Sequence, residues 1–81
     1  MSYFVYILEC SDQTLYTGIT TDVDKRLEEH NTSDKGAKYT KARRPVKLLY
    51  CEDAPDRSTA SKREYAIKKL TRIEKLKLIG S

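Results

Sequence analysis

The stretch that decides the fold runs from Tyr3 to Thr20, Tyr-Phe-Val-Tyr-Ile-Leu-Glu-Cys-Ser-Asp-Gln-Thr-Leu-Tyr-Thr-Gly-Ile-Thr. Residues 3–10 and 15–20 are rich in aromatic and β-branched side chains, and turn-forming residues separate them, which predicts a β-hairpin. The first run is apolar at both sets of alternating positions, so both of its faces should be covered. We therefore expect it to be the central strand of a sheet.

The length of the hairpin loop determines which side chains share a face. A two-residue turn at residues 12–13 would place Tyr6 and Tyr16 on opposite faces, whereas a three- or five-residue loop brings both to one face together with Gly18. We predict the longer loop. Gly18 would then leave room beside Tyr6 for another group to approach the sheet.

Helical patterns and a third strand follow the hairpin. A first helix should begin after Thr21 or Asp22 and run to about Asn31. A short helix fits residues 37–42, and a strand bounded by prolines fits residues 46–51. A third helix should run from residue 57 or 58 to residue 70, with Asp56 or Ser58 as its cap.

The last helix is predicted from a capping box. Thr71 and Glu74 have the Thr-x-x-Glu form, so a new short helix should cover residues 72–79 and stop at Gly80. Ile73, Leu76 and Ile79 would anchor it.

Together these elements predict an α+β fold, layered, in which a three-stranded antiparallel sheet is flanked by helices. The 81 residues suffice for one domain with a modest core and contain no repeat or linker. Residues 1–81 should therefore form a single domain.

The distribution of charge favours a polyanionic partner. The chain has 16 Lys and Arg against 12 Asp and Glu, and from residue 35 to residue 50 every charged side chain is positive. These are Lys35, Lys38, Lys41, Arg43, Arg44 and Lys47. Nucleic acid is a reasonable partner for such a run, although a solvated basic loop is the alternative.

The two cysteines, Cys10 and Cys51, end apolar strand-like runs and lack metal-ligand spacing. We expect both to be buried thiols in a reducing cytoplasm. No apolar segment approaches the roughly 20 residues that span a bilayer, and the N-terminus has no signal-peptide pattern. The expected location is the cytoplasm, with no membrane contact.

Three polar residues fall on faces that should point inward. Arg26 and His30 share an arc of about 100° with two apolar residues of the first helix, and Glu64 lies on the apolar face of the third helix. Simpler interpretations exist: Arg26 extends past an apolar patch, His30 is a hydrogen-bonded boundary residue, and Glu64 pairs with Lys68.

The order of these residues resembles that of GIY-YIG endonuclease domains. Phe4-Val5-Tyr6 and Tyr16-Thr17-Gly18 are similar to the two tripeptides of that family, with Phe4 in place of Gly and Thr17 in place of Ile. The resemblance covers essentially the whole chain and is closest to small stand-alone bacterial members. The matching residues that follow are Arg26, His30, Lys38 to Thr40, and Glu64.

The resemblance implies a DNA endonuclease that hydrolyses phosphodiester bonds with one Mg²⁺ or Mn²⁺ ion. Glu64 would be the metal ligand, because Mg²⁺ takes only one or two protein carboxylates. Arg26 would bind phosphate through its planar fork. We expect Tyr6 to be the general base and Tyr16 to position water, although either tyrosine needs a nearby cation to accept a proton. His30 would orient the tyrosine or relay its proton.

The predicted substrate contacts are made by the remaining motif residues and the basic segment. They are Gly18, Lys38, Tyr39, Lys41, Arg43 and Arg44. DNA is the expected substrate, and duplex, branched and single-stranded forms, a link to repair or recombination, and a targeting protein partner all stay open. No small-molecule cofactor is expected. The alternatives are a nucleic-acid-binding module without turnover and a structural or protein-interaction domain.

Overall fold

The computed structural model describes residues 2–32 and 38–80. Its first two strands, β1 (Tyr3–Glu9) and β2 (Leu15–Thr20), form the hairpin predicted above. Glu9 pairs with Leu15, so a five-residue loop connects the strands. Tyr6 lies opposite Gly18 and Leu8 opposite Tyr16, which puts both tyrosines and the glycine on one face. The prediction of the longer loop is confirmed.

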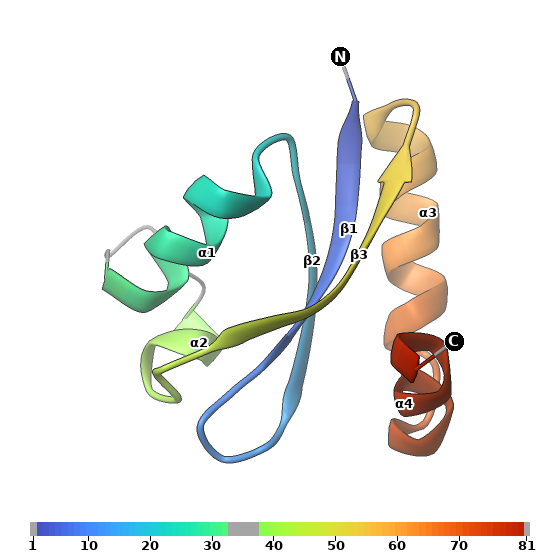
Figure 1. Cartoon of the computed structure of the whole chain (residues 1–81). Coiled ribbons are helices and arrows are strands. Elements are labelled where there is room, and N and C mark those ends of the chain that lie inside the picture. The colour runs from blue at the N-terminus through green and yellow to red at the C-terminus, as the bar shows by residue number, and fades with distance from the viewer. Residues whose placement is uncertain (1, 33–37, 81) are drawn as a thin grey trace.

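The third strand, β3 (Lys47–Ala54), pairs antiparallel with β1 and is longer at its C-terminal end than predicted. The strand order is β2-β1-β3, so β1 is the central strand as expected (Figure 1). This position explains why β1 is apolar at every position from residue 3 to residue 8, since each of its faces is covered.

The helices divide between the two faces of the sheet. Helices α1 (Val23–Thr32) and α2 (Lys38–Lys41) lie on one face, and α3 (Arg57–Lys68) and α4 (Arg72–Gly80) lie on the other (Figure 1). Among the described residues, no helix is both long and apolar enough to cross a membrane. The result is the three-layer α+β architecture that the sequence predicts.

Polar side chains cap these helices where the sequence indicates. The backbone N–H of Lys25 donates to Oδ1 of Asp22 at 3.1 Å, and that of Thr59 donates to Oδ1 of Asp56 at 2.7 Å. At the start of α4, the N–H of Thr71 donates to Oε1 of Glu74 at 2.9 Å, and the N–H of Glu74 donates to Oγ1 of Thr71 at 3.2 Å. This reciprocal pair is the predicted capping box.

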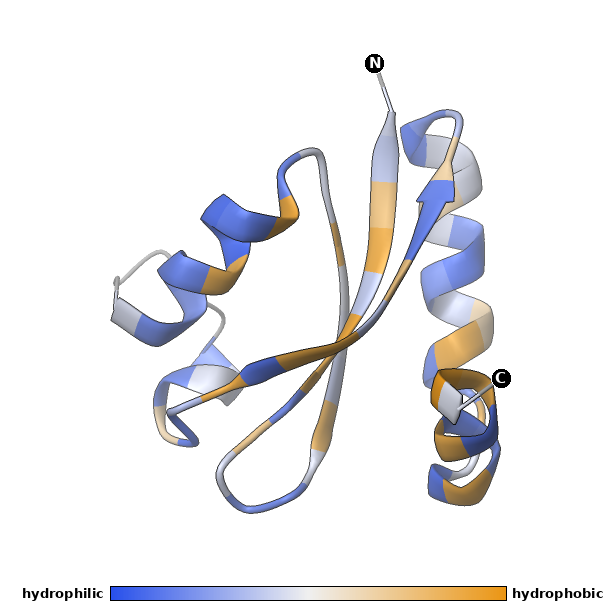
Figure 2. Cartoon of the chain, in the orientation of Figure 1, coloured by the Kyte–Doolittle hydropathy of each residue, from blue (hydrophilic) through white to orange (hydrophobic). Residues whose placement is uncertain are grey.

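Two apolar clusters lie on opposite sides of β1. Figure 2 shows hydrophobic residues along β1, the strand that contributes to both. The cluster beneath α3 consists of Val5, Ile7, Ala54, Ala60 and Ile67. The other cluster consists of Tyr6, Leu8, Cys10 and Val46, with Tyr16 and Leu27 packed against it. The alternation of β1 therefore gives the α1 side a core that contains a tyrosine hydroxyl.

Two predictions about burial are wrong. Cys51 is exposed, because its strand β3 is at the edge of the sheet and opens onto a groove of ≈ 410 Å³ that Phe4 and Leu48 also line. In α4, Ile73 is 68% exposed and Leu76 43% exposed. The helix is instead anchored near its end, where Leu78 and Ile79 pack against the core beneath α3.

Candidate active site

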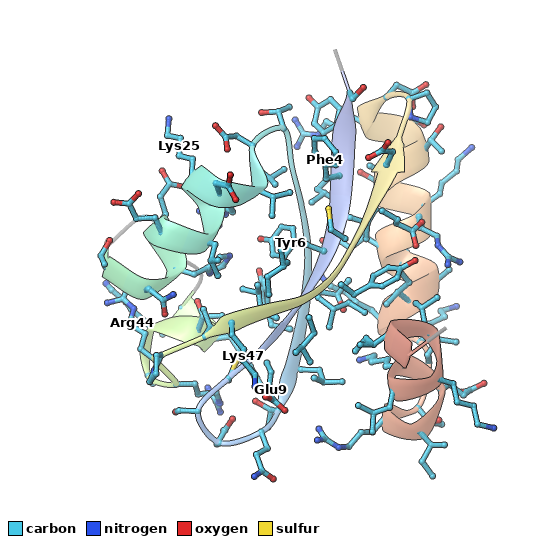
Figure 3. The ribbon with its side chains drawn as sticks, viewed as in Figure 1. Phe4, Tyr6, Glu9, Lys25, Arg44 and Lys47 are labelled. Carbon is cyan, nitrogen blue, oxygen red and sulfur yellow. The ribbon has the colours of Figure 1, made fainter. Side chains whose placement is uncertain are left out.

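Tyr6 projects from the central strand toward α1 (Figure 3) and is only 2% exposed. Its hydroxyl lies 2.9 Å from Nε2 of His30. A Cβ atom at position 18 would lie 2.5 Å from this hydroxyl oxygen, which is closer than side chains approach one another. The tyrosine therefore occupies the space that Gly18 leaves beside the sheet. The prediction that this space admits another group is wrong, because Tyr6 itself fills it.

His30 is fully buried and has polar partners on both sides of its ring. Nε2 faces the Tyr6 hydroxyl, and Nδ1 lies 2.7 Å from Oγ1 of Thr40 in α2. Burial lowers the pKa of His30 to about 4, helped by the positive charges of Arg26 and Arg44 and opposed by Glu29. The ring is therefore neutral at physiological pH, with one nitrogen that donates and one that accepts.

The environment of Tyr6 stabilises its neutral form. Burial raises the pKa of the hydroxyl to about 12; Tyr16 and Glu64 add to the rise, while the Arg26 guanidinium opposes it. Tyr6 therefore keeps its proton in the resting protein. To act as a base it needs additional positive charge close to its oxygen.

Arg26 lies on the same face of α1 as His30 and acts electrostatically on the Tyr6 hydroxyl. One guanidinium nitrogen is 3.2 Å from Oε1 of Glu29, one helical turn away, and the two side chains are 26% and 20% exposed. This pair holds the guanidinium beside the tyrosine. The guanidinium presents its five N–H donors in a planar fork, the geometry that matches the oxygens of a phosphate.

A row of side chains in ring contact continues from His30 toward the hairpin loop. The ring of Tyr16 is 5.3 Å from that of His30 and stacks on Tyr39 at 6.0 Å between centroids. The guanidinium of Arg43 covers the Tyr39 ring at 3.9 Å. Tyr39 is thus held between Tyr16 and Arg43, and the row fixes the orientation of Tyr16.

The two arginines of the basic segment form internal contacts. Arg43 bonds through Nε to Oδ2 of Asp12 at 3.0 Å and through a terminal nitrogen to the carbonyl oxygen of Tyr39 at 2.9 Å. Arg44 bonds to the carbonyl oxygens of His30 and Glu29 at 2.5 and 3.4 Å. Both side chains therefore support the structure around His30 and Tyr39. Lys38 and Lys41 are exposed on α2, and Lys35 lies outside the described residues.

Glu64 has the simpler partner that its sequence spacing suggests. Its Oε2 is 3.6 Å from Nζ of Lys68, and its side chain is 23% exposed. Its negative charge also contributes to the raised pKa of Tyr6, so the carboxylate lies within electrostatic range of that hydroxyl. Glu64 therefore pairs with Lys68 and also lies close enough to Tyr6 to affect its hydroxyl.

The donor groups fit a hard cation better than a zinc ion. Within residues 2–32 and 38–80, no three His, Cys, Asp and Glu side chains gather into a ligand cluster. A structural zinc site takes four such ligands and a catalytic one takes three. Mg²⁺ instead keeps several waters and takes one or two carboxylates together with substrate phosphate. A single carboxylate such as Glu64 matches the second case.

Thr40 is a partner of His30 that was not predicted from the sequence. It is fully buried and gives His30 its second partner. The Lys-Tyr-Thr triplet is the sequence signal that includes it, although only Lys38 and Tyr39 of that triplet were predicted to contact substrate. The threonine lies in a helix of four residues, too short for a periodic pattern.

Known proteins match this chain over nearly its whole length. The GIY-YIG catalytic domain model matches residues 2–77. A UPF0213 protein of Desulfotalea psychrophila is 59% identical over 78 residues, which cover 96% of this chain and 71% of the relative. One of Syntrophus aciditrophicus is 60% identical over 76 residues, covering 94% and 87%.

Two solution NMR structures are similar in fold as well as sequence. The UPF0213 protein of Bacillus halodurans is 46% identical, with a TM-score of 0.63 over 99% of this chain and 84% of that chain. A protein of E. faecalis is 43% identical, with a TM-score of 0.63 over 96% and 83%. The chain therefore belongs to the GIY-YIG catalytic domain family, a nuclease family, with bacterial UPF0213 proteins as close relatives.

Proposed function

We propose that this protein is a divalent-metal-dependent DNA endonuclease that hydrolyses phosphodiester bonds. The observation that carries the proposal is the buried hydrogen-bonded chain from Tyr6 through His30 to Thr40, with the Arg26 guanidinium beside it. Burying polar groups costs free energy that an apolar core would not incur. A network of this kind next to a cation supports a role in chemistry, and family membership supports the reaction class.

In this proposal Arg26 binds the scissile phosphate. The guanidinium carries a permanent charge and presents paired donors to phosphate oxygens, and such donors stabilise the charge that grows on those oxygens in the transition state. Its ion pair with Glu29 orients the fork before substrate arrives. Lysine would supply charge but not the paired geometry.

Tyr6 is our proposed general base, with Tyr16 positioning the attacking water. The pKa of about 12 means that the hydroxyl gives up its proton only when positive charge is added near it. His30 orients the hydroxyl through its neutral Nε2 and offers that nitrogen as the first acceptor along the chain. The stack of Tyr39 and Arg43 holds Tyr16 in place.

Glu64 is the proposed ligand for one Mg²⁺ or Mn²⁺ ion. Such an ion would counter charge on the phosphate oxygens and lower the pKa of groups beside it. The carboxylate must exchange Lys68 for the cation. That exchange costs little because the lysine of this 3.6 Å pair is half-exposed, and ion pairs at the surface contribute only about 0–1 kcal/mol. No other described carboxylate needs to move.

We propose that DNA is also held through Tyr39 and the basic segment, whereas the buried Gly18 serves the site by leaving room for the Tyr6 ring. Lys38 and Lys41 supply exposed charge, whereas Arg43 and Arg44 contribute mainly by supporting the segment that carries them. We further propose that residues 1–81 act as one nuclease domain in the cytoplasm, on structured DNA of the kind met in repair or recombination.

A cleavage assay over duplex, single-stranded, flap and branched DNA, with Mg²⁺ or Mn²⁺, tests the proposal. Glu64→Ala and Arg26→Ala should abolish cleavage yet retain the fold and most DNA binding, because both roles fall mainly in the transition state. Lys68→Gln is the matched control for Glu64→Ala, since it removes only the ion-pair partner of the carboxylate. Wild-type protein inert on every form, or a Glu64→Ala variant that cuts at the wild-type rate, would leave a nucleic-acid-binding module.

A further inference from the structure

A cavity of ≈ 140 Å³ lies beside the hairpin loop, on the α3 and α4 side of the sheet. Its lining residues are Thr14, Leu15, Arg72 and Lys75. A water molecule occupies about 30 Å³ in the liquid, so the space holds a group several times larger. Two of the four lining side chains are cations, which makes an anionic occupant the favourable one.

Both cations have capacity for a ligand. Arg72 donates one terminal N–H to the carbonyl oxygen of Gln13 at 2.6 Å, which fixes the guanidinium at the cavity, and it makes no other hydrogen bond with residues 2–32 and 38–80. Within the same residues, Lys75 forms no ion pair with a carboxylate. A guanidinium and an ammonium group at one cavity offer the positive charge and the N–H donors that bind a phosphate.

The nearby carboxylates are engaged by other groups. Asp12 pairs with Arg43 at 3.0 Å and accepts a bond from the Thr14 hydroxyl at 2.6 Å. Glu74 accepts from the backbone N–H of Thr71 in the capping box. Neither acid pairs with Arg72 or Lys75, so the cavity retains its positive character.

The hairpin loop lies between two basic groups that are far apart in sequence. Arg43, which follows α2, contacts Asp12, and Arg72 of α4 contacts Gln13. The hairpin loop is therefore bonded to one arginine from each of these regions. Figure 1 shows α2, the loop and α4 at the same end of the molecule. The hairpin loop thus connects the basic segment 38–47 to the basic side chains of α4.

We propose that the Arg72 and Lys75 cavity binds a backbone phosphate of the DNA, as a second contact on the opposite face of the sheet from Lys38 and Lys41. This inference rests on the proposed function, because it assigns DNA as the source of the phosphate. It implies that α4, whose role would otherwise be packing alone, belongs to the substrate-binding surface.

The test measures DNA affinity by fluorescence anisotropy as a function of salt. Each phosphate contact contributes about 0.9 to the slope of log K against log salt for duplex DNA. Lys75→Gln should reduce that slope by about 0.9 and weaken binding at low salt. Lys77→Gln is the matched control, because it removes the same charge from the same helix at a position outside the cavity.

A second measurement follows the backbone amide signals of Thr14 and Leu15 by NMR with inorganic phosphate and with DNA. DNA should shift both signals in wild type and not in the Lys75→Gln variant. Shifts with inorganic phosphate alone would overturn the assignment to DNA in favour of a free anion. Equal salt slopes for wild type and both variants would overturn the proposal that the cavity binds a DNA phosphate, while leaving the proposed function intact. Wild-type protein that binds no DNA would overturn the proposed function.

Discussion

The hydroxyl of Tyr6 and Nε2 of His30 lie 2.9 Å apart, and both side chains are buried. With a pKa of about 12 on the tyrosine and about 4 on the histidine, both groups are neutral at physiological pH. In the tautomer that carries the ring proton on Nδ1, the Tyr6 hydroxyl donates to Nε2 and Nδ1 donates to Oγ1 of Thr40. This arrangement satisfies the three groups and joins β1, α1 and α2 through one polar chain.

The first prediction is that His30 titrates far below an ordinary histidine. Burial and two neighbouring arginines disfavour the cation, so the midpoint should be near pH 4 instead of 6.5. His30 is the single histidine of the chain, which makes its ring signals unambiguous in an NMR titration. A midpoint near 6.5 would mean that the ring is hydrated and that the buried chain does not form.

The second prediction concerns stability and pH. Because the folded-state pKa of His30 lies below the unfolded value, the unfolded chain takes up a proton that the native state does not as pH falls from 6.5 toward 4. The free energy of unfolding should therefore decrease through this window, by up to 1.4 kcal/mol per pH unit. Urea unfolding at pH 7 and pH 5 measures the change. His30→Gln removes the titrating group, so that variant should show little change between these two values.

The third prediction concerns Thr40. Thr40→Val keeps the shape of the side chain but removes the hydroxyl that faces Nδ1 of His30 at 2.7 Å. Depriving a buried donor of its partner costs about 1–3 kcal/mol. Thr40→Ser retains the hydroxyl and is the matched control. If urea unfolding shows Thr40→Val to be as stable as Thr40→Ser, the hydroxyl does not hold the ring.

The fold could be predicted from the sequence wherever local patterns determine it. The double alternation of residues 3–8 identifies the central strand, and Thr71 with Glu74 identifies the start of α4. Burial at the edges could not be predicted in this way. Cys51 and Ile73 look like core residues locally, but their exposure depends on where β3 and α4 lie relative to the other layers.

The candidate site shows the same division. The 100° spacing in α1 brings Arg26 and His30 onto one face, and the loop length brings Tyr6 and Tyr16 together. The pairing of His30 with Thr40 joins residues ten apart that lie in two different helices, so the periodic pattern of a single element does not predict it. The bonds of Arg43 and Arg44 to backbone carbonyls depend likewise on tertiary geometry.

The fourth prediction concerns Gly18. Gly18→Ala would place a methyl group 2.5 Å from the Tyr6 oxygen and 2.7 Å from Cζ, and the tyrosine cannot move freely because His30 holds it. Overpacking of this kind costs about 1–3 kcal/mol, and cleavage should fall because Tyr6 is displaced. Gly80→Ala is the control, since a methyl group there meets no atom within 4 Å. Equal stability of the two variants in urea would show that Tyr6 does not fill the space beside Gly18.

The fifth prediction separates the two tyrosines. Tyr6→Phe deletes only the hydroxyl that bonds His30, so loss of a general base should reduce the single-turnover cleavage rate by about 10² to 10⁴. Tyr16→Phe should reduce it less, because its ring keeps its edge contact with His30 and its stacking on Tyr39. The lost hydrogen bond of Tyr6 costs about 0.5–1.5 kcal/mol of stability, so rates are compared at a temperature where urea unfolding shows both variants fully folded. A larger loss for Tyr16→Phe would exchange the two roles, and cleavage at the wild-type rate by both variants would remove tyrosine from the proton transfer.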